Sequence, residues 1–325
     1  MNLIFYDIGA AGSIPDHWKK KLLRKKTIIY AFDENTYKNK NVPVKDFKIK
    51  FLNTLLSEGK YKKKFYILNR DTGSSFYKIS KKFIEYISQD YHGLKKEIFV
   101  ETKSLNSLIV KNEIKKADLI KLDTQGSELE ILQGYKKNLD SLIGIETEIE
   151  FEEIYEKQPT FAKIDSFLKK NHFELIDIRP ARVFHSNRVI ENYYYNKYSA
   201  DNNYNWLQKL VACDALYLKN TEWLKKQNMK TIYKYFEILY IYNFFDRAFS
   251  LLENFKKDKI INKKCYLFLK LQFELKNKKS FYKIFFLKLI RKTEYIISII
   301  LHLLNKYLPR CLKNIIFSEK SWHNY

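Results

Sequence analysis

The sequence predicts an α/β fold in which a doubly wound sheet carries helices on both faces. Apolar runs of strand length alternate with segments of helical periodicity from residue 2 to residue 218. The first run ends in a glycine turn at residues 7–12, and the second ends in Asp33, 21 residues after Gly12. A strand, a glycine turn, a helix, a strand and an acid in this order are typical of folds that bind a nucleotide-like ligand.

The first half of the chain supplies five of the predicted strands. Residues 2–8 (NLIFYDI) are a short apolar run of the kind found in buried strands, and Ser13 or Asp16 can cap the following helix. Pro15 suits the first turn of that helix. Four further apolar runs predict short strands: residues 26–32, 46–52, 64–69 and 98–102. The last of these leads into a capped helix.

The most distinctive segment is residues 117–134, ADLIKLDTQGSELEILQG. Residues 118–122 predict a buried strand that ends at Asp123, Gly126 makes the turn, and Ser127 can cap a helix. Apolar side chains then recur at helical spacing, namely Leu129, Leu132 and Tyr135. The next strand, residues 142–149, carries three acids on one face because side chains alternate with a period of two: Glu146, Glu148 and Glu150.

The last third of this region completes the sheet. Residues 161–170 predict a helix, and residues 173–178 and 211–218 predict the final two strands. Between these strands, residues 181–206 form a polar insert that could act as a substrate lid. Arginines in and beside the insert could meet an anionic sugar or phosphate: Arg179, Arg182 and Arg188.

Several functional classes are disfavoured. Neither the full GxGxxG pattern nor GxxxxGK[ST] occurs, which argues against dinucleotide and triphosphate sites. The cysteines lie far apart and form no CxxC pair, which fits a reducing compartment: Cys213, Cys265 and Cys311. The longest charge-free apolar stretch late in the chain is residues 295–305, shorter than the roughly 20 residues that cross a bilayer. No basic leader precedes the first strand, so we expect a cytoplasmic protein.

Residues 3–218 resemble the FkbM family of class I S-adenosylmethionine-dependent methyltransferases. The resemblance rests on YDIGAAG (6–12), YAFDEN (30–35), LNTLLSE (52–58), the GSS triplet (73–75) and above all DLIKLDTQGSELEILQG (118–134). It implies a Rossmann-like sheet of seven strands with the final strand antiparallel. It also implies methyl transfer, usually to oxygen, on small molecules or glycans.

The resemblance also implies a cofactor site. The first motif, which holds the methionyl part of S-adenosylmethionine, covers Asp7, Gly9, Ala10 and Gly12. Asp33 matches the ribose-binding glutamate of the family's "FEP" sequence. Leu55 and Ser57 fall where the edge of the adenine pocket lies. Asp123 matches the acid of the family's "KIDVEGxE" pattern, in which Gln125 replaces a glutamate.

The sequence departs from the family in three ways. The second strand ends in Asp-Glu-Asn instead of Glu-Pro, and no helix precedes the first strand to cover the cofactor. A basic segment, residues 219–325, follows the predicted domain of residues 1–218. We therefore predict two domains, a methyltransferase domain and an α-helical tail. In the tail, residues 232–251, 265–275 and 281–304 have helical periodicity.

Methyl transfer needs an acceptor oxygen aligned with the activated methyl group and benefits from a general base. Asp123 is the first candidate for this role because it ends the central strand at the ligand edge of the sheet. Its alternative role is a helix cap. Glu148 is the second candidate, and its alternative is a solvated strand edge. Asp123, Glu146 and Glu148 could together hold Mg²⁺, but the usual Asp-Asn partner is absent, so we expect no metal site.

The net charge of +23 raises the question of a partner. Residues 219–325 hold 23 basic and 8 acidic residues, a net charge of +15. Basic residues beside aromatic and aliphatic ones suit an anionic membrane surface, such as the inner face of the plasma membrane, or a glycan-assembly protein. A codon bias that enriches Lys would also raise the charge.

The sequence leaves three functions open. The first is O-methylation of a sugar or small molecule in cell-surface glycan (lipopolysaccharide or capsule) or secondary-metabolite biosynthesis. The second is a methyltransferase that binds nucleic acid. The sequence gives this function little support, because the turn after residue 122 contains no proline. The sequence also has no aromatic RNA-binding signature. The third is a catalytically idle binding module.

Overall fold

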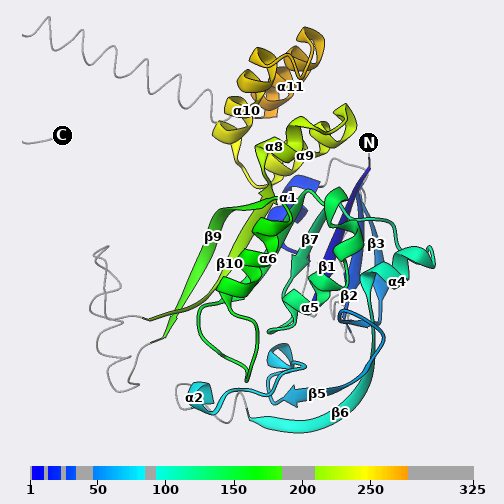
Figure 1. The fold of residues 1–325 in the computed structure, drawn as a ribbon, viewed down its shortest axis with the longest axis vertical. Helices are drawn as coiled ribbons and strands as arrows, with labels where there is room; N and C mark the ends of the chain where they lie inside the picture. The colour runs from blue at the N-terminus through cyan, green and yellow to red at the C-terminus, as the bar shows by residue number, and fades with distance from the viewer. Residues whose placement is uncertain are drawn as a thin grey trace, which may run out of the picture. The chain divides into compact units, whose positions relative to one another are not determined.

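The protein contains a seven-stranded mixed sheet with helices on both faces (Figure 1). The computed structural model describes residues 2–10, 14–22, 27–33, 47–84, 93–184 and 209–276. Strand order in the sheet is β3-β2-β1-β7-β8-β10-β9. The strands are β1 (Leu3–Ile8), β2 (Thr27–Phe32), β3 (Phe47–Leu52), β7 (Leu119–Leu122), β8 (Gly144–Glu150), β9 (Phe173–Phe184) and β10 (Lys209–Lys219).

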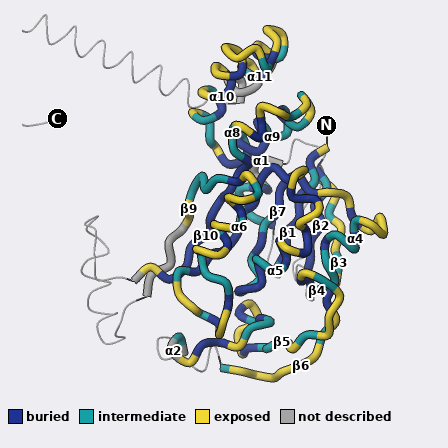
Figure 2. Tube along the Cα trace, viewed as in Figure 1, coloured by how far each residue is buried: buried dark blue, intermediate teal, exposed yellow. Residues whose placement is uncertain are grey.

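Strand directions follow the predicted class. The strands from β3 to β8 pair in parallel, whereas β10 runs antiparallel to both β8 and β9. The Rossmann-like sheet with an antiparallel final strand is therefore confirmed. The central strands are buried along most of their length (Figure 2), which is why they appear in the sequence as continuous apolar runs.

One face of the sheet packs on the helices that follow β6, β7 and β8. These helices are α4 (Leu105–Val110), α5 (Glu128–Gln133) and α6 (Phe161–Lys170). Their buried side chains, including Leu108, Leu132 and Leu168, join Tyr6 and Ile120 of the strands in one hydrophobic core. A short 3₁₀ helix, η2 (Lys136–Ser141), connects α5 to β8. The apolar spacing of Leu132 and Tyr135 therefore indicated a core-facing helix.

The opposite face carries α1 (Asp16–Leu22), in which Asp16, one of the two predicted caps, is the first helical residue. Phe5 of β1 packs edge-on against Trp18 of α1, with ring centroids 5.0 Å apart. Side chains alternate along a strand, so Phe5 and Asp7 lie on this face and Tyr6 lies on the other. The predicted cap Ser13 lies outside the described residues.

A second, three-stranded sheet follows β3 in the sequence. Its order is β4-β6-β5, formed by β4 (Leu55–Leu56), β5 (Lys62–Leu68) and β6 (Leu94–Lys103). Two short helices, η1 (Asp71–Gly73) and α2 (Lys81–Ile84), lie between β5 and β6. The strands predicted at residues 64–69 and 98–102 are present, but they pair with each other antiparallel, outside the large sheet.

Four helices follow β10 within the described part of the chain: α8 (Thr221–Lys225), α9 (Met229–Ile241), α10 (Phe245–Lys257) and α11 (Lys263–Lys276). The single helix predicted over residues 232–251 is two helices, because Asn243 adopts a left-handed conformation with φ of 63° and ends α9. The helix predicted at residues 281–304 lies outside the described residues.

The chain forms two compact units, residues 1–248 and 249–325. This division falls later than the domain boundary predicted after residue 218. Helix α9 belongs to the first unit, where Lys234 Nζ lies 2.6 and 2.8 Å from the carboxylate oxygens of Asp118. At the end of the helix, Trp18 Nε1 donates a hydrogen bond to Tyr242 Oη at 3.1 Å. Helix α9 therefore covers the sheet beside α1.

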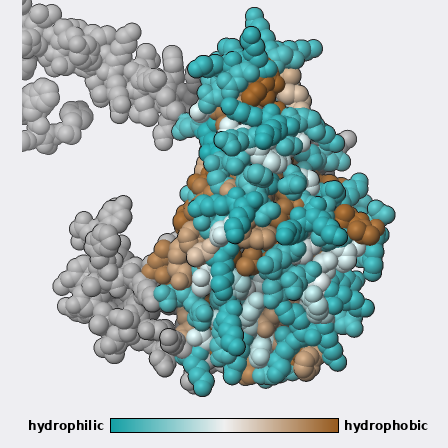
Figure 3. Space-filling view, viewed as in Figure 1, coloured by the Kyte–Doolittle hydropathy of each residue, from teal (hydrophilic) through white to brown (hydrophobic). Residues whose placement is uncertain are grey.

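No described helix has the length and apolar character needed to cross a bilayer. Hydrophilic side chains cover most of the surface drawn in colour in Figure 3, with smaller hydrophobic clusters among them.

Candidate active site

A cavity of about 340 Å³ lies at the carboxyl ends of β1, β2 and β7. Four of the predicted cofactor residues line it: Gly9, Asp33, Leu55 and Asp123. Phe65, Ile67 and Phe76 contribute an apolar wall, and they come from the small sheet and the loop that follows it. The apolar run at residues 64–69 predicts a strand, but it has no polar–apolar alternation that would mark a face lining a cavity.

The turns after β1 and β7 come closest to each other at Gly9. Its φ is +83°, and a Cβ built on it would lie 1.9 Å from the main-chain oxygen of Asp123. Its N–H donates to the carbonyl of Phe32 at 3.0 Å, and the N–H of Asp123 donates to the carbonyl of Ile8 at 3.0 Å. The turns after the three strands are therefore held together in a space that only glycine fits.

Lys121 links two acids across the sheet. Its Nζ lies 3.7 Å from Asp7 Oδ1 and 3.3 Å from Asp123 Oδ2. Burial lowers the pKa of Lys121, but the charges of Asp7, Asp123 and Glu146 outweigh that effect and raise it. The ammonium group therefore stays charged. It holds the half-buried carboxylate of Asp123 at the cavity, and it also lies near the fully buried Asp7.

Gln125 connects the two candidate catalytic acids. Its Nε2 donates to Asp123 Oδ1 at 3.1 Å and to Glu148 Oε2 at 2.7 Å. Its own Oε1 accepts from Tyr155 Oη at 2.9 Å, and its φ of 57° turns the backbone toward these partners. The sequence showed Gln125 only as a departure from the family pattern, and its connecting role depends on the pairing of β7 with β8.

Glu148 is buried, with 2% of its surface exposed, and it does not line the cavity. The alternative of a solvated strand edge is therefore wrong for Glu148, because β8 is an inner strand between β7 and β10. The N-cap position of α5 belongs to Ser127 and not to Asp123. Glu128 accepts from the N–H and the hydroxyl of Thr124 at 2.8 and 2.9 Å and so fixes the turn.

Other predicted residues support the site from within the protein. Ser57 is fully buried, and its hydroxyl lies 2.8 Å from Thr102 Oγ1. Ala10 is buried, and its N–H donates to the carbonyl of Phe32 at 3.2 Å. Ser127 occupies the N-cap position of α5, but its hydroxyl donates to the carbonyl of Thr124 instead of capping the helix. Gly12 lies outside the described residues.

The turn at η1 lies over the cavity. Asp71, Thr72 and Ser74 line it, and none of them was predicted as a site residue. Ser75 Oγ donates to the carbonyl of Gln125 at 2.6 Å, and Tyr155 Oη lies 2.9 Å from the carbonyl oxygen of Gly73. The GSS triplet therefore fixes this turn against the turn that follows β7.

The acids considered for Mg²⁺ do not converge on one point. Glu146 points toward α1 and α9, where it meets His17 and Tyr242, and Glu148 binds Gln125. Among the described residues, no group of three or more His, Cys, Asp or Glu side chains is placed to hold a metal ion. Most of the insert at residues 181–206, including Arg188, lies outside the described residues.

One comparison with known proteins gave a match. The family model described as "Methyltransferase FkbM domain" matches residues 7–175, more than half of the chain. The matched residues include the glycine turn, Asp33, the small sheet and the turn after β7, which together surround the cavity. No curated protein and no solved structure shows a significant match to the chain.

Proposed function

Because the chain belongs to the FkbM methyltransferase family, we propose that it transfers a methyl group from S-adenosylmethionine to a hydroxyl oxygen of a sugar or small molecule. The observation that carries this proposal is the cavity that joins Gly9, Asp33 and Asp123 at the carboxyl edge of the sheet. We further propose a role in cell-surface glycan or secondary-metabolite biosynthesis in the cytoplasm.

The cavity suits the proposed cofactor in size and chemistry. Its volume of about 340 Å³ is within the range of small-molecule sites. Asp33 ends β2 at the cavity, where its carboxylate can accept hydrogen bonds from ribose hydroxyls. Phe65, Ile67 and Leu55 offer an apolar environment for the adenine ring. Gly9 also lines the cavity, where its backbone can contact the methionyl part.

The bound cofactor would supply an activated methyl group, so the protein needs mainly to position the acceptor. Asp123 lines the cavity and can accept a hydrogen bond, and then the proton, from the acceptor hydroxyl. Lys121 and Gln125 each contact one of its two carboxylate oxygens and fix its orientation. Glu148 would act through Gln125 as a positioning residue, because it does not line the cavity.

Replacing Asp33 by Ala should weaken S-adenosylmethionine binding about 10- to 100-fold, because hydrogen bonds to a charged group contribute about 1.5–3 kcal/mol. Isothermal titration calorimetry of the wild type and the variant measures this change. Glu58→Ala removes an exposed acid that does not line the cavity, and it should bind as the wild type does. Equal affinities for Asp33→Ala and the wild type would show that the cofactor site is assigned wrongly.

Replacing Asp123 by Asn should lower kcat about 100-fold, as expected for loss of a general base, while cofactor affinity changes little. Transfer of tritium from S-adenosyl-[methyl-³H]methionine to glycan extracts measures turnover. Lys121→Gln keeps the carboxylate but loses its charged partner, and should retain more activity than Asp123→Asn. Wild-type turnover in Asp123→Asn would limit this residue to positioning the acceptor.

Two alternatives remain distinct from this proposal. A nucleic-acid methyltransferase would retard RNA at physiological salt, and an idle binding module would bind the cofactor without turnover. For the tail, residues 219–325, we propose contact with an anionic membrane surface or a glycan-assembly protein. In its described part, α11 combines exposed Lys263 and Lys264 with exposed Leu267, Phe268 and Leu271, a combination that suits such a surface.

A further inference from the structure

A row of charged side chains crosses the large sheet on the face that carries α1. Lys121 on β7 is the register partner of Asp7 on β1 and of Glu146 on β8, so the three side chains lie next to one another on this face. Asp123, two residues after Lys121, reaches the same ammonium group, with Oδ2 3.3 Å from Nζ. One ammonium group therefore serves three carboxylates.

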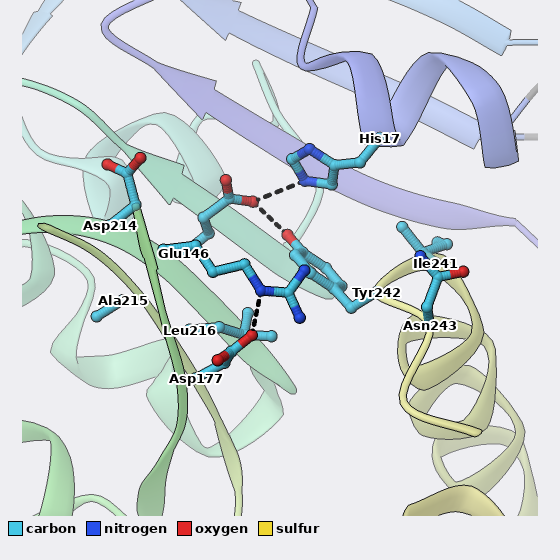
Figure 4. A pocket seen from close by; sticks show the side chains of 10 residues that line it. His17, Glu146, Asp177, Asp214, Ala215, Leu216, Ile241, Tyr242 and Asn243 are labelled. Carbon is cyan, nitrogen blue, oxygen red and sulfur yellow. Dashed lines mark hydrogen bonds and ion pairs between the residues drawn. The ribbon is translucent and has the colours of Figure 1, made fainter. Parts of the chain in front are cut away.

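Glu146 is held at the outer end of this row by side chains beside two helices (Figure 4). His17 Nε2, on α1, lies 3.1 Å from Glu146 Oε2, and Tyr242 Oη, just after α9, donates a hydrogen bond to the same oxygen. Trp18 Nε1 donates to the Tyr242 hydroxyl, which leaves the hydroxyl proton for Glu146. Burial raises the pKa of Glu146, but these two partners and Lys121 outweigh this effect and lower it. Glu146 therefore stays charged in a fixed orientation.

Other titratable and charged groups surround both Glu146 and Asp123. Glu146 lines a cavity of about 240 Å³ between α1, the end of α9 and strands β8, β10 and β9, together with His17, Asp177, Arg179, Asp214 and Tyr242. The groups near Asp123, besides Lys121, are Asp33 across the cofactor cavity, Glu148 through Gln125, Glu128 and Tyr155. All of these groups stay in place when only the charge of Glu146 is removed, so such a variant isolates the contribution of Glu146.

Sharing Lys121 affects how readily Asp123 accepts a proton. A carboxylate that has an ammonium group to itself is a weak base, because the positive charge favours the ionised form. Glu146 draws on the same ammonium group and adds a negative charge, and both effects increase the proton affinity of Asp123. A general base needs this affinity, because proton transfer is most efficient when the pKa of the base lies near the working pH.

We propose that Glu146 is a positioning residue for Asp123, which shares the ammonium group of Lys121 with it and so becomes a stronger proton acceptor. His17 and Tyr242 hold Glu146 in the orientation that this sharing requires. The inference rests on the proposed function, because it concerns the acid assigned there as the base. It also gives Tyr242, which lies beyond the family match, a part in the reaction.

Carbon-13 NMR titration of the full-length protein tests this proposal without an acceptor. Aspartate labelled at its side-chain carboxyl carbon makes Asp123 visible, and the signal that is lost in Asp123→Asn identifies it. Glu146→Gln keeps the shape of the side chain but removes its charge, and it should move the titration midpoint of Asp123 to lower pH by at least about 0.5. Glu113→Gln, an exposed acid outside both cavities, should leave this midpoint unchanged.

Two further comparisons test the route by which Glu146 acts. In the Lys121→Gln background, Glu146→Gln should shift the Asp123 midpoint by about half as much or less, because the shared ammonium group is absent. Tyr242→Phe should raise the midpoint of Glu146 itself, measured with labelled glutamate, because the charged form loses a hydrogen bond. Tyr235→Phe on α9 is the matched control, because the Tyr235 hydroxyl is also buried but donates to the carbonyl of Lys219 at 2.9 Å.

The outcomes separate this proposal from the proposed function. Calorimetry of Asp33→Ala and methyl transfer by the wild type test the function, whereas the midpoint of Asp123 tests the inference. In the active enzyme, Glu146→Gln should also move the acid limb of the kcat profile to lower pH, which a purely structural role of Glu146 would not do.

Three results would each overturn the proposal. The first is an Asp123 midpoint in Glu146→Gln that equals or exceeds the wild-type midpoint. The second is an equal shift with and without Lys121, and the third is a Glu146 midpoint that is the same in Tyr242→Phe and Tyr235→Phe. If Glu146→Gln does not fold by near-ultraviolet circular dichroism, Glu146→Ala takes its place. If Lys121→Gln does not fold, the first and third results decide.

Discussion

Replacing Lys234 by Met should lower the free energy of unfolding of the first compact unit by about 3–5 kcal/mol. Asp118 is buried, and both of its oxygens lie within 2.8 Å of Lys234 Nζ. Oδ2 also accepts the N–H of Ile4 at 2.9 Å. Without Lys234, the buried carboxylate loses its charged partner and must either stay charged at a high cost or bind a proton.

The pKa of Asp118 shows which response dominates. Burial raises this pKa, and Lys234 lowers it only in part. In Lys234→Met the pKa of this carboxyl group should rise further, so the loss of stability should shrink as the pH falls. Urea unfolding followed by Trp fluorescence at several pH values measures both effects.

Lys230→Met is the comparison for this experiment, because Lys230 is exposed on the same helix and lowers the pKa of Asp118 through its charge alone, whereas Lys234 is also hydrogen-bonded to Asp118. Its effect should stay below about 0.5 kcal/mol. Equal unfolding midpoints for the two variants would mean that α9 does not depend on Asp118 for its place beside the sheet.

Replacing Gly9 by Ala should cost about 3 kcal/mol or more of unfolding free energy and abolish measurable cofactor binding. An added Cβ meets the main-chain oxygen of Asp123 at 1.9 Å, and the φ of +83° is strained for any L side chain. The contact is with backbone, so relief requires that the turns after β1 and β7 separate. That movement would also displace Asp123 from the cavity.

Gly59→Ala provides the comparison for Gly9→Ala. There, a Cβ meets only the ring of Tyr61, which is about half exposed and can move. We expect less than about 1 kcal/mol of destabilisation and normal cofactor affinity. Calorimetry with S-adenosylmethionine and chemical unfolding should be measured on the same samples. A Gly9→Ala chain as stable as Gly59→Ala would contradict the close approach of the two turns.

The strands of the large sheet could be predicted from the sequence because most are buried on both faces. The runs at residues 2–8 and 26–32 agree with β1 and β2 to within one residue. The separate small sheet could not be predicted, because β5 and β6 are identified as strands by local pattern while their partners are set by distant contacts. The position of α9 could not be predicted for a similar reason, because periodicity shows that one face of a helix is buried but not which element covers it.

The candidate site could be predicted in part. The resemblance placed Gly9, Asp33 and Asp123 at one edge of the sheet, where they line one cavity. It could not show that Gln125 joins Asp123 to Glu148, because that contact depends on the register of β7 with β8. It also could not show that Glu146 meets Tyr242, 96 residues later in the chain.

The hydrogen bond between Trp18 and Tyr242 has a consequence for how the chain folds during its synthesis on the ribosome. These side chains lie 224 residues apart in the sequence, yet they complete the same layer beside the sheet. During translation, strand β1 and helix α1 leave the ribosome long before α9 is synthesised. Apolar surface around Trp18 therefore stays uncovered for most of elongation, and such surfaces favour aggregation of nascent chains. Chaperones that bind emerging polypeptides would have their strongest effect on this protein before Tyr242 emerges.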